Sequence, residues 1–151
     1  LIAMSESGWW NKTPLNKMTD EQWEALCDRC GKCCLNKLVN DEGDYFYTSV
    51  SCSLMNSNTS CCTHYKQRLQ LKSGCLKVTP KNINDIVEWL PKTCAYRLLH
   101  QGQPLHAWHP LLNDGQVTHA VHIQFKNRLV SEDHLKTAVL EDFIVEDEDL
   151  L

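Results

Sequence analysis

The sequence predicts a small, irregular α+β domain of mainly short helices with a few short strands, organised around a cysteine cluster. Apolar residues with helical spacing alternate with short β-branched runs along the chain. The 151 residues, 42% of them hydrophobic, suffice for one modest core. Four of the nine cysteines fall within residues 27–34. We therefore expect a single cysteine-cluster domain over residues 1–151, with an acidic, disordered tail over residues 141–151.

The first helix is expected to begin after Thr19. The Thr19 side chain can cap the first turn while Gln22, three residues later, reaches back to the cap. The residues at i, i+3, i+4 and i+7 of this helix would share one face: Trp23, Leu26, Cys27 and Cys30. The pattern thus predicts that two thiols point together into the core.

The segment after this helix is expected to be irregular. Gly31 allows the chain to leave the helix, so Cys33 and Cys34 are expected on a turn. β-branched and aromatic residues predict a strand over residues 45–50, and residues 62–69 predict a short helical turn.

The second half predicts a mixture of helices and strands. In order, the expected elements are a brief strand over residues 75–78, a helix over residues 80–90 capped by Thr79, a helix over residues 93–101 that bears Cys94, a strand over residues 117–125 with alternating apolar positions, and an amphipathic helix from residue 131.

Composition limits the classes of function. No apolar run approaches the roughly 20 residues that cross a bilayer, so we expect no membrane span. The first residues show no secretory pattern, and we expect a cytoplasmic protein. Disulfides seldom persist in a reducing compartment, so nine cysteines favour metal ligation or redox chemistry.

The strongest motif is Cys27-x-x-Cys30-x-x-Cys33-Cys34. Its first three cysteines have the spacing that wraps a [4Fe-4S] cluster in bacterial ferredoxins, with a fourth ligand from elsewhere. The first pair equally matches half of a tetrahedral zinc site. Side chains of adjacent residues diverge, so Cys33 and Cys34 are expected to serve two neighbouring sites, or one of them is a spectator. Zinc and iron both remain open.

Other thiols can complete such sites. Further cysteines stand at five positions: Cys52, Cys61, Cys62, Cys75 and Cys94. Eight thiolates suffice for two four-cysteine sites. The alternative is that isolated cysteines are small buried apolar residues. A redox dithiol at Cys27 and Cys30 is disfavoured, because that pair closes a helix and does not stand at a strand-to-helix junction.

Long stretches resemble a known family. The matching stretches are residues 26–38, the pattern Cys62-x-x-Tyr65-x-x-Arg68, residues 88–99 and residues 107–112. These runs resemble the YcgN family of bacterial cysteine-cluster proteins, which is similar to the wider CxxCxxCC group described as zinc- or iron-chelating. The resemblance implies metal chelation. It marks these residues as family cysteines: Cys27, Cys30, Cys33, Cys34, Cys52, Cys62, Cys75 and Cys94. Cys61 departs from the family pattern, which has its cysteine at the position of Ser60.

Three hypotheses on function follow. The first is a cytoplasmic metal-binding protein with zinc, iron or an iron-sulfur cluster. The second is a metal-dependent enzyme, in which His109 could bind metal or transfer protons, although a packed structural histidine is the simpler interpretation. The third is a zinc-stabilised module whose basic stretch, residues 66–97, meets nucleic acid or an acidic protein partner.

Overall fold

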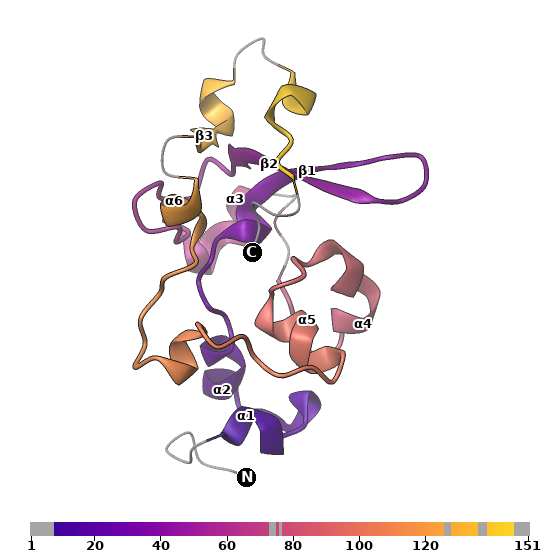
Figure 1. The fold of residues 1–151 in the computed structure, drawn as a ribbon, viewed down its shortest axis with the longest axis vertical. Helices are drawn as coiled ribbons and strands as arrows, with labels where there is room; N and C mark the ends of the chain where they lie inside the picture. Colours follow the sequence, from indigo (N-terminus) through magenta and orange to yellow (C-terminus); the bar gives the residue numbers. More distant parts are fainter. Residues whose placement is uncertain (1–7, 73–74, 76, 126–127, 136–138, 147–151) are drawn as a thin grey trace. The chain divides into compact units, whose positions relative to one another are not determined.

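The structure is a computed structural model that describes residues 8–72, 75, 77–125, 128–135 and 139–146. It holds short helices and one small sheet, which confirms the predicted α+β class (Figure 1). Contacts divide the chain into two compact units. Unit 1 comprises residues 1–28 and 78–117, and unit 2 comprises residues 29–77 and 118–151. Each unit is described by itself, and a single domain over residues 1–151 stays a prediction.

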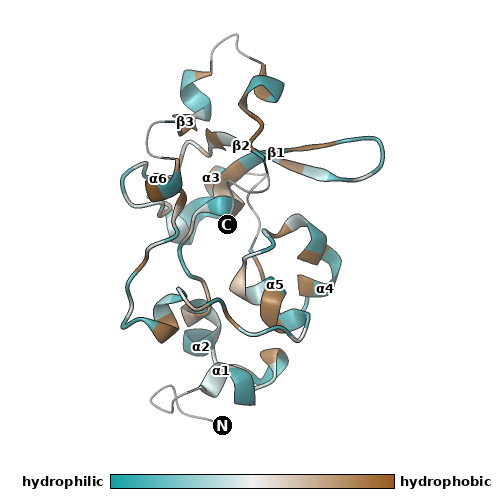
Figure 2. Cartoon of the chain, viewed as in Figure 1, coloured by the Kyte–Doolittle hydropathy of each residue, from teal (hydrophilic) through white to brown (hydrophobic). Residues whose placement is uncertain are grey.

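Unit 1 is helical. Its elements are α1 (Trp9–Lys12), a 3₁₀ turn (Leu15–Lys17), α2 (Asp20–Ala25), α4 (Ile83–Ile86), a 3₁₀ turn (Val87–Trp89), α5 (Ala95–His100) and a 3₁₀ turn (Pro110–Leu112). Apolar and polar residues alternate along α4 and α5, as expected for helices with one face in a core (Figure 2). The core residues are Trp9, Trp23, Leu26, Ile83, Leu90, Ala95, Tyr96 and Leu105.

The start of α2 confirms the prediction, and its end corrects it. Thr19 and Gln22 form the reciprocal capping box. The helix nevertheless ends at Ala25, so Cys27 and Cys30 do not share a helical face. Cys27 is exposed and Cys30 is buried. The physical reason is a left-handed backbone at Arg29, with φ of 60°, which turns the chain between the two cysteines.

The two later helices of unit 1 are shorter than predicted. Thr79 Oγ1 accepts a hydrogen bond from Asn82 N, which confirms a cap, but α4 begins only at Ile83. Cys94 is the N-cap residue of α5 and precedes its first turn. Gly102 follows that helix with φ of 74°, as expected for a glycine beyond a helix end.

Unit 2 contains the sheet, in the order β1-β2-β3. Its strands are β1 (Leu35–Val39), β2 (Tyr45–Ser51) and β3 (Val130–Ser131). β1 and β2 are antiparallel with a bulge between Leu35 and Lys37, and β3 is parallel to β2. The strand predicted over residues 45–50 is confirmed. The buried core residues of unit 2 are Leu35, Tyr47, Met55, Val121, Phe125 and Val145.

The strand predicted over residues 117–125 is wrong. This segment instead forms the helix α6 (Val121–Gln124). Val121 and Phe125 are buried four residues apart, a spacing that a helix also places on one face, whereas Ile123 is 47% exposed. The amide of Val121 donates to the carbonyl oxygen of Cys30 at 2.7 Å, which fixes the start of this helix against the cysteine segment.

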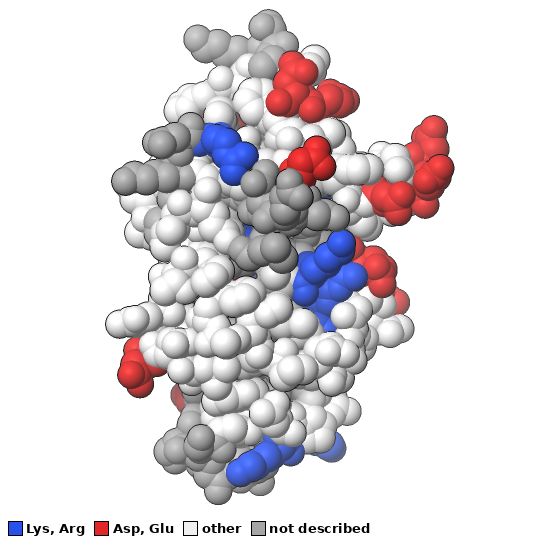
Figure 3. All heavy atoms as spheres, in the orientation of Figure 1, with Lys and Arg blue, Asp and Glu red and all other residues white. Residues whose placement is uncertain are grey.

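The β1 and β2 strands form a hairpin that extends from the rest of unit 2 (Figure 1). Val39 pairs with Tyr45 near its tip, and both side chains are exposed. The loop between the strands is hydrophilic, and the carboxylates of Asp41, Glu42 and Asp44 gather there (Figures 2 and 3). The hairpin therefore joins strand ends with exposed apolar side chains to an acidic tip.

The remaining elements of unit 2 are single turns. They are a 3₁₀ turn over Lys32–Cys34, another over Tyr65–Gln67, α3 (Arg68–Leu71), and 3₁₀ turns over Glu132–His134 and Leu140–Phe143. The helix predicted from residue 131 is thus only a turn, and Cys75, Lys77 and Val78 are not in a strand. In the predicted tail over residues 141–151, Val145 N donates a hydrogen bond to Tyr47 O. Residues 147–151 of this tail lie outside the described residues. No described helix has the length and apolar character that crossing a membrane requires.

Candidate metal centre

All nine cysteines lie among the described residues, and none of them is joined to another in a disulfide. Seven belong to unit 2: Cys30, Cys33, Cys34, Cys52, Cys61, Cys62 and Cys75. Unit 1 holds Cys27, which is exposed, and Cys94, which is partly buried against the helical core. Six of the eight predicted ligands therefore occur in one compact unit.

The backbone conformation of Gly31 positions the turn that carries Cys33 and Cys34. Gly31 has φ of 80°, and a Cβ built on it would lie 2.9 Å from the Cβ of Ser60 and 3.0 Å from Val121 Cγ2. A glycine is required here both for the left-handed conformation and for the close approach of these two segments. The turn over Lys32–Cys34 follows directly, which confirms the predicted turn at Cys33 and Cys34.

Two backbone links bring the later cysteines to this turn. The amide of Cys52 donates to Cys34 O at 2.8 Å, just beyond the end of β2. An antiparallel bridge between Met55 and Cys62 then returns the chain toward Cys52. The loop between them is closed by the hydrogen bond from Asn56 N to Cys61 O. Residues 18 or more positions from Cys34 thereby enter its surroundings.

Glu132 holds the segment that follows Cys52. Its carboxylate accepts hydrogen bonds from Lys72 Nζ at 2.8 Å, from Ser53 N at 3.0 Å and from Asn36 Nδ2 at 3.2 Å. Burial alone would raise the pKa of this carboxyl, but the three donors outweigh it and lower the pKa to about 2. An ionised Glu132 thus ties β1, the Cys52 segment and α3 together.

Crowding of the thiols shows in their electrostatics. The pKa of Cys34 is raised by its hydrogen bond with the Cys33 side chain, by burial, and by the negative charges of the Cys33, Cys52 and Cys62 thiolates. The pKa of Cys75 is raised mainly by burial, and also by the thiolates of Cys52, Cys62 and Cys33. The thiolates of Cys33, Cys52 and Cys62 therefore disfavour ionisation of both Cys34 and Cys75. A bound cation would reverse this mutual penalty, because it stabilises the thiolate forms.

Cys33 and Cys34 interact more strongly than expected. Side chains of adjacent residues were expected to diverge, yet the Cys33 side chain is the largest cause of the raised pKa of Cys34. The reason is that both lie in a single 3₁₀ turn, Lys32–Cys34, that ends where β1 begins. A shared role for both thiols is thus compatible with the backbone.

Lys37 and Arg68 are among the cations that interact with the crowded thiols. Lys37 Nζ donates to Cys33 O at 3.1 Å and to Leu35 O at 2.9 Å. Burial lowers the pKa of Lys37 to about 8, and the thiolates of Cys33, Cys34 and Cys30 oppose that shift. On another side, the charge of Arg68 favours the thiolate of Cys75, and its guanidinium lies 3.9 Å from the centre of the Tyr65 ring.

The thiols do not converge on a single point. Among the described residues, no group of three or more His, Cys, Asp or Glu side chains is arranged to hold a metal ion directly. The donor chemistry nevertheless fits zinc, iron or an iron-sulfur cluster, because each is bound by cysteine thiolates in sets of four. The six thiols of the predicted set in unit 2 exceed that number.

His109 does not join this set. Its imidazole is buried in unit 1, where Nε2 donates to Leu26 O and Nδ1 accepts from Leu111 N. Both ring nitrogens are engaged in structural hydrogen bonds. The packed-histidine interpretation is therefore the one that the structure supports.

The basic stretch over residues 66–97 is largely engaged within the fold. Lys72 pairs with Glu132 in unit 2, and Arg97 pairs with Glu88 and donates to Leu90 O in unit 1. Figure 3 shows charged side chains of both signs on the visible face. A nucleic acid or acidic partner stays a prediction.

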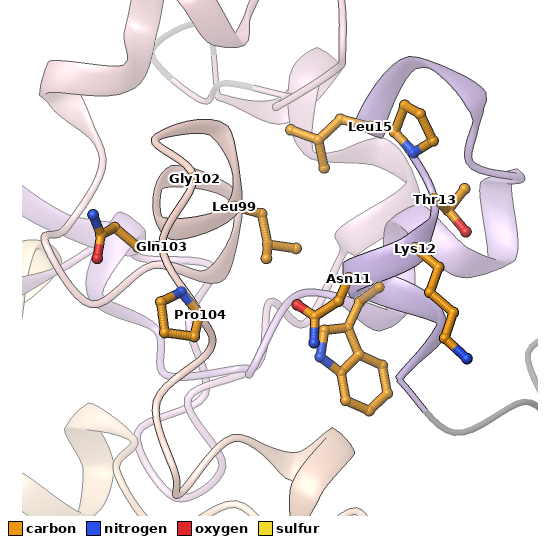
Figure 4. Close-up of a pocket in the computed structure, with 10 residues that line it drawn as sticks. Asn11, Lys12, Thr13, Leu15, Leu99, Gly102, Gln103 and Pro104 are labelled. Carbon is orange, nitrogen blue, oxygen red and sulfur yellow. The ribbon is translucent and has the colours of Figure 1, made fainter.

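A pocket of about 590 Å³ is lined by residues of unit 1. Residues 10–15 and 102–104 line it together with Leu99. Leu15 and Leu99 project into the space between these segments (Figure 4). The lining includes no Cys, His, Asp or Glu, so it offers neither thiolate nor carboxylate ligands for a metal.

Comparison with known proteins identifies relatives of this chain that share one family name. A UPF0260 protein of Shewanella frigidimarina (strain NCIMB 400) is 47% identical over 139 residues, which cover 91% of this chain and 92% of the relative. The chain belongs to the YcgN (UPF0260) family. Family members named YcgN from Salmonella paratyphi A and Salmonella newport (strain SL254) are each 43% identical over 135 residues, or 88% of this chain and 90% and 88% of the relatives. No family model matches this YcgN-family chain. No solved structure matches it either.

Sequence reasoning missed Lys37 and Glu132. Lys37 lies inside a stretch that resembles the family, but nothing in its spacing indicates that its ammonium returns to Cys33. Glu132 was assigned only to a helix start. Both roles depend on pairing between distant segments, and the available signal was their position beside β-branched or cysteine-rich runs.

Proposed function

We propose that this protein binds zinc or iron, the latter as an ion or an iron-sulfur cluster, through cysteine thiolates in the cytoplasm. The observation that carries the proposal is the crowding of five thiols in unit 2: Cys33, Cys34, Cys52, Cys62 and Cys75. Without a cation the thiolates of Cys33, Cys52 and Cys62 raise the cost of ionising Cys34 and Cys75, and a bound metal would offset that cost. Binding free energy would then become folding free energy.

The family resemblance extends this set to eight thiols. Cys30 is buried beside the same turn, and its Sγ accepts a hydrogen bond from Lys32 N at 3.4 Å. The resemblance also marks Cys27 and Cys94, which belong to unit 1. In this proposal the eight family cysteines are metal ligands, and Cys61 is not.

The test is metal content after anaerobic purification. Elemental analysis should find zinc or iron, and visible absorption separates a coloured iron-sulfur protein from a colourless zinc protein. C34S, C52S and C62S should each lose most of the metal, because they remove ligands from the crowded site. C61S is the matched control, since it makes the same change at the neighbour of Cys62 and should retain metal.

Two further variants test the extended set. C27S and C94S should lower metal content if unit 1 contributes ligands, and their effect can be compared with C61S. Anaerobic wild-type protein that contains neither zinc nor iron, and takes up neither when supplied, would refute the proposed function.

A further inference from the structure

The ammonium of Lys37 lies against the backbone of the cysteine turn, unlike those of the exposed lysines of unit 2. β1 begins directly after the cysteine turn, and the Lys37 side chain runs back along it. Its ammonium donates to the carbonyl oxygens of Cys33 and Leu35, which lie on either side of Cys34. A positive charge is therefore hydrogen-bonded to the backbone that carries two of the crowded thiols.

The sheet fixes this arrangement. Lys37 pairs with Tyr47 across the β1 and β2 ladder, and its ammonium lies 5.0 Å from the centre of the Tyr47 ring. The register of the β1 and β2 pairing shifts between Leu35 and Lys37. Tyr47 is buried in the core of unit 2, so its ring is held in place for a cation–π contact with the Lys37 ammonium.

The position of the Lys37 ammonium matters for the charge of a metal-thiolate centre. Four thiolates around one divalent ion leave a net charge of about −2 on the centre. Such a charge is costly in a partly buried site unless a cation lies nearby. Lys37 is within electrostatic reach of Cys30, Cys33 and Cys34. Lys72, which interacts with Cys52, is already paired with Glu132, and Arg68 interacts with Cys75.

We propose that Lys37 is a positioning residue of the thiolate site, which holds the Cys33–Leu35 backbone by two hydrogen bonds and offsets the negative charge of the metal-bound thiolates. This inference rests on the proposed function. Groups beyond the ligands commonly tune metal affinity in this way, and their loss costs about 10- to 100-fold in affinity.

The experiment uses Co²⁺ as the probe, because its ligand-field and sulfur-to-metal absorption bands report both binding and ligand geometry. Wild type, K37M, K37Q and K37R are titrated anaerobically with Co²⁺ against a competing chelator. K66M is the matched control, since Lys66 is exposed in the same unit and loses the same charge. Circular dichroism of each metal-free variant monitors folding.

K37M should bind Co²⁺ at least about tenfold more weakly than wild type, with unchanged absorption bands. K37Q, which keeps a donor but loses the charge, should also bind weakly, so that the test survives if K37M folds poorly. K37R should recover most of the affinity. K66M should bind like wild type. The retained spectrum and the recovery by K37R separate a counter-ion from a merely structural residue.

Three results would overturn the inference: K37M and K37Q with wild-type affinity, K37R as weak as K37M, or K66M as weak as K37M. In each of these cases wild-type binding stays intact and the proposed function stands. Wild-type protein that binds no Co²⁺, Zn²⁺ or iron would refute the proposed function itself, and this inference with it.

Discussion

The imidazole of His109 donates from Nε2 to the backbone oxygen of Leu26 at a distance of 2.7 Å. Leu26 is fully buried at the end of α2, and His109 is 3% exposed. The hydrogen bond therefore joins the last turn of that helix to the segment after α5. It also satisfies a carbonyl group that the end of the helix would leave without a partner.

H109A should destabilise unit 1 without removing metal. The substitution leaves Leu26 O and Leu111 N without their side-chain partner, so we expect the free energy of unfolding to fall by about 2–3 kcal/mol. Urea denaturation measures this loss. H134A, at an exposed histidine, is the control and should be close to neutral. Loss of bound zinc or iron from folded H109A would contradict the structural assignment.

G31A should disrupt the cysteine turn. Alanine at Gly31 adds a left-handed backbone cost and a clash with Ser60 and Val121, and we expect a total of about 2–4 kcal/mol. G43A is a matched control, because Gly43 has φ of 87° but no atom within 4 Å of the added Cβ. Thermal unfolding compares the two variants. Equal losses would show that the close approach at Gly31 carries no cost.

Stability should fall in acid through Glu132. Its pKa is about 2 in the folded chain against an ordinary 4.5, so its contribution is present above about pH 4.5 and is lost as the pH falls toward 2. We expect E132Q to cost about 1 kcal/mol near neutral pH, since the side chain is partly exposed. Denaturation at several pH values should show that this difference shrinks in acid. With E42Q, at an exposed carboxylate, no comparable difference is expected.

Y96F isolates one hydrogen bond of the unit 1 core. The Tyr96 hydroxyl donates to Trp23 O at 2.7 Å, and the two rings lie 4.6 Å apart at 33°. Phenylalanine keeps the ring contact but leaves a buried carbonyl without this partner, so we expect a loss of about 1–2 kcal/mol. Urea denaturation measures it. A neutral Y96F would mean that Trp23 O finds another donor.

Local signals in the sequence predicted local structure well. The capping box at Thr19 and Gln22 needs only residues three apart, and it forms as predicted. The end of α2 depends instead on distant contacts. Gly31 packs against Ser60 and Val121, and Cys30 O accepts from Val121 N, so the chain leaves the helix to meet segments that spacing alone cannot place.

The segment over residues 117–125 shows the limit of periodicity. Its alternating apolar residues fit a strand, but Val121 and Phe125 fit one face of a helix equally well. Burial decides between them, and burial is set by packing against Leu35 and Met55 in the core of unit 2. A short apolar run is therefore compatible with both a strand and a helix until the residues that pack against it are known.

The candidate site was predictable in its donors but not in its surroundings. Crowded cysteines at residues 27–34 indicated that thiols would gather, and the thiolates of Cys33, Cys52 and Cys62 do raise the pKa values of Cys34 and Cys75. Which cations accompany them follows from strand pairing and from the Glu132 hydrogen bonds, neither of which has a pattern in the sequence. Cys27 was predicted to accompany Cys30, and a single left-handed residue, Arg29, separates their environments.

In the sheet of unit 2, β1 is an edge strand, and Val39 near the hairpin tip is 57% exposed. The unpaired backbone groups of an edge strand with apolar side chains form a template that can pair with a strand of another chain. Asp41, Glu42 and Asp44 crowd the end of that template with like charge. Two copies whose β1 strands pair in parallel would bring these carboxylates together, and their repulsion disfavours that mode of self-association.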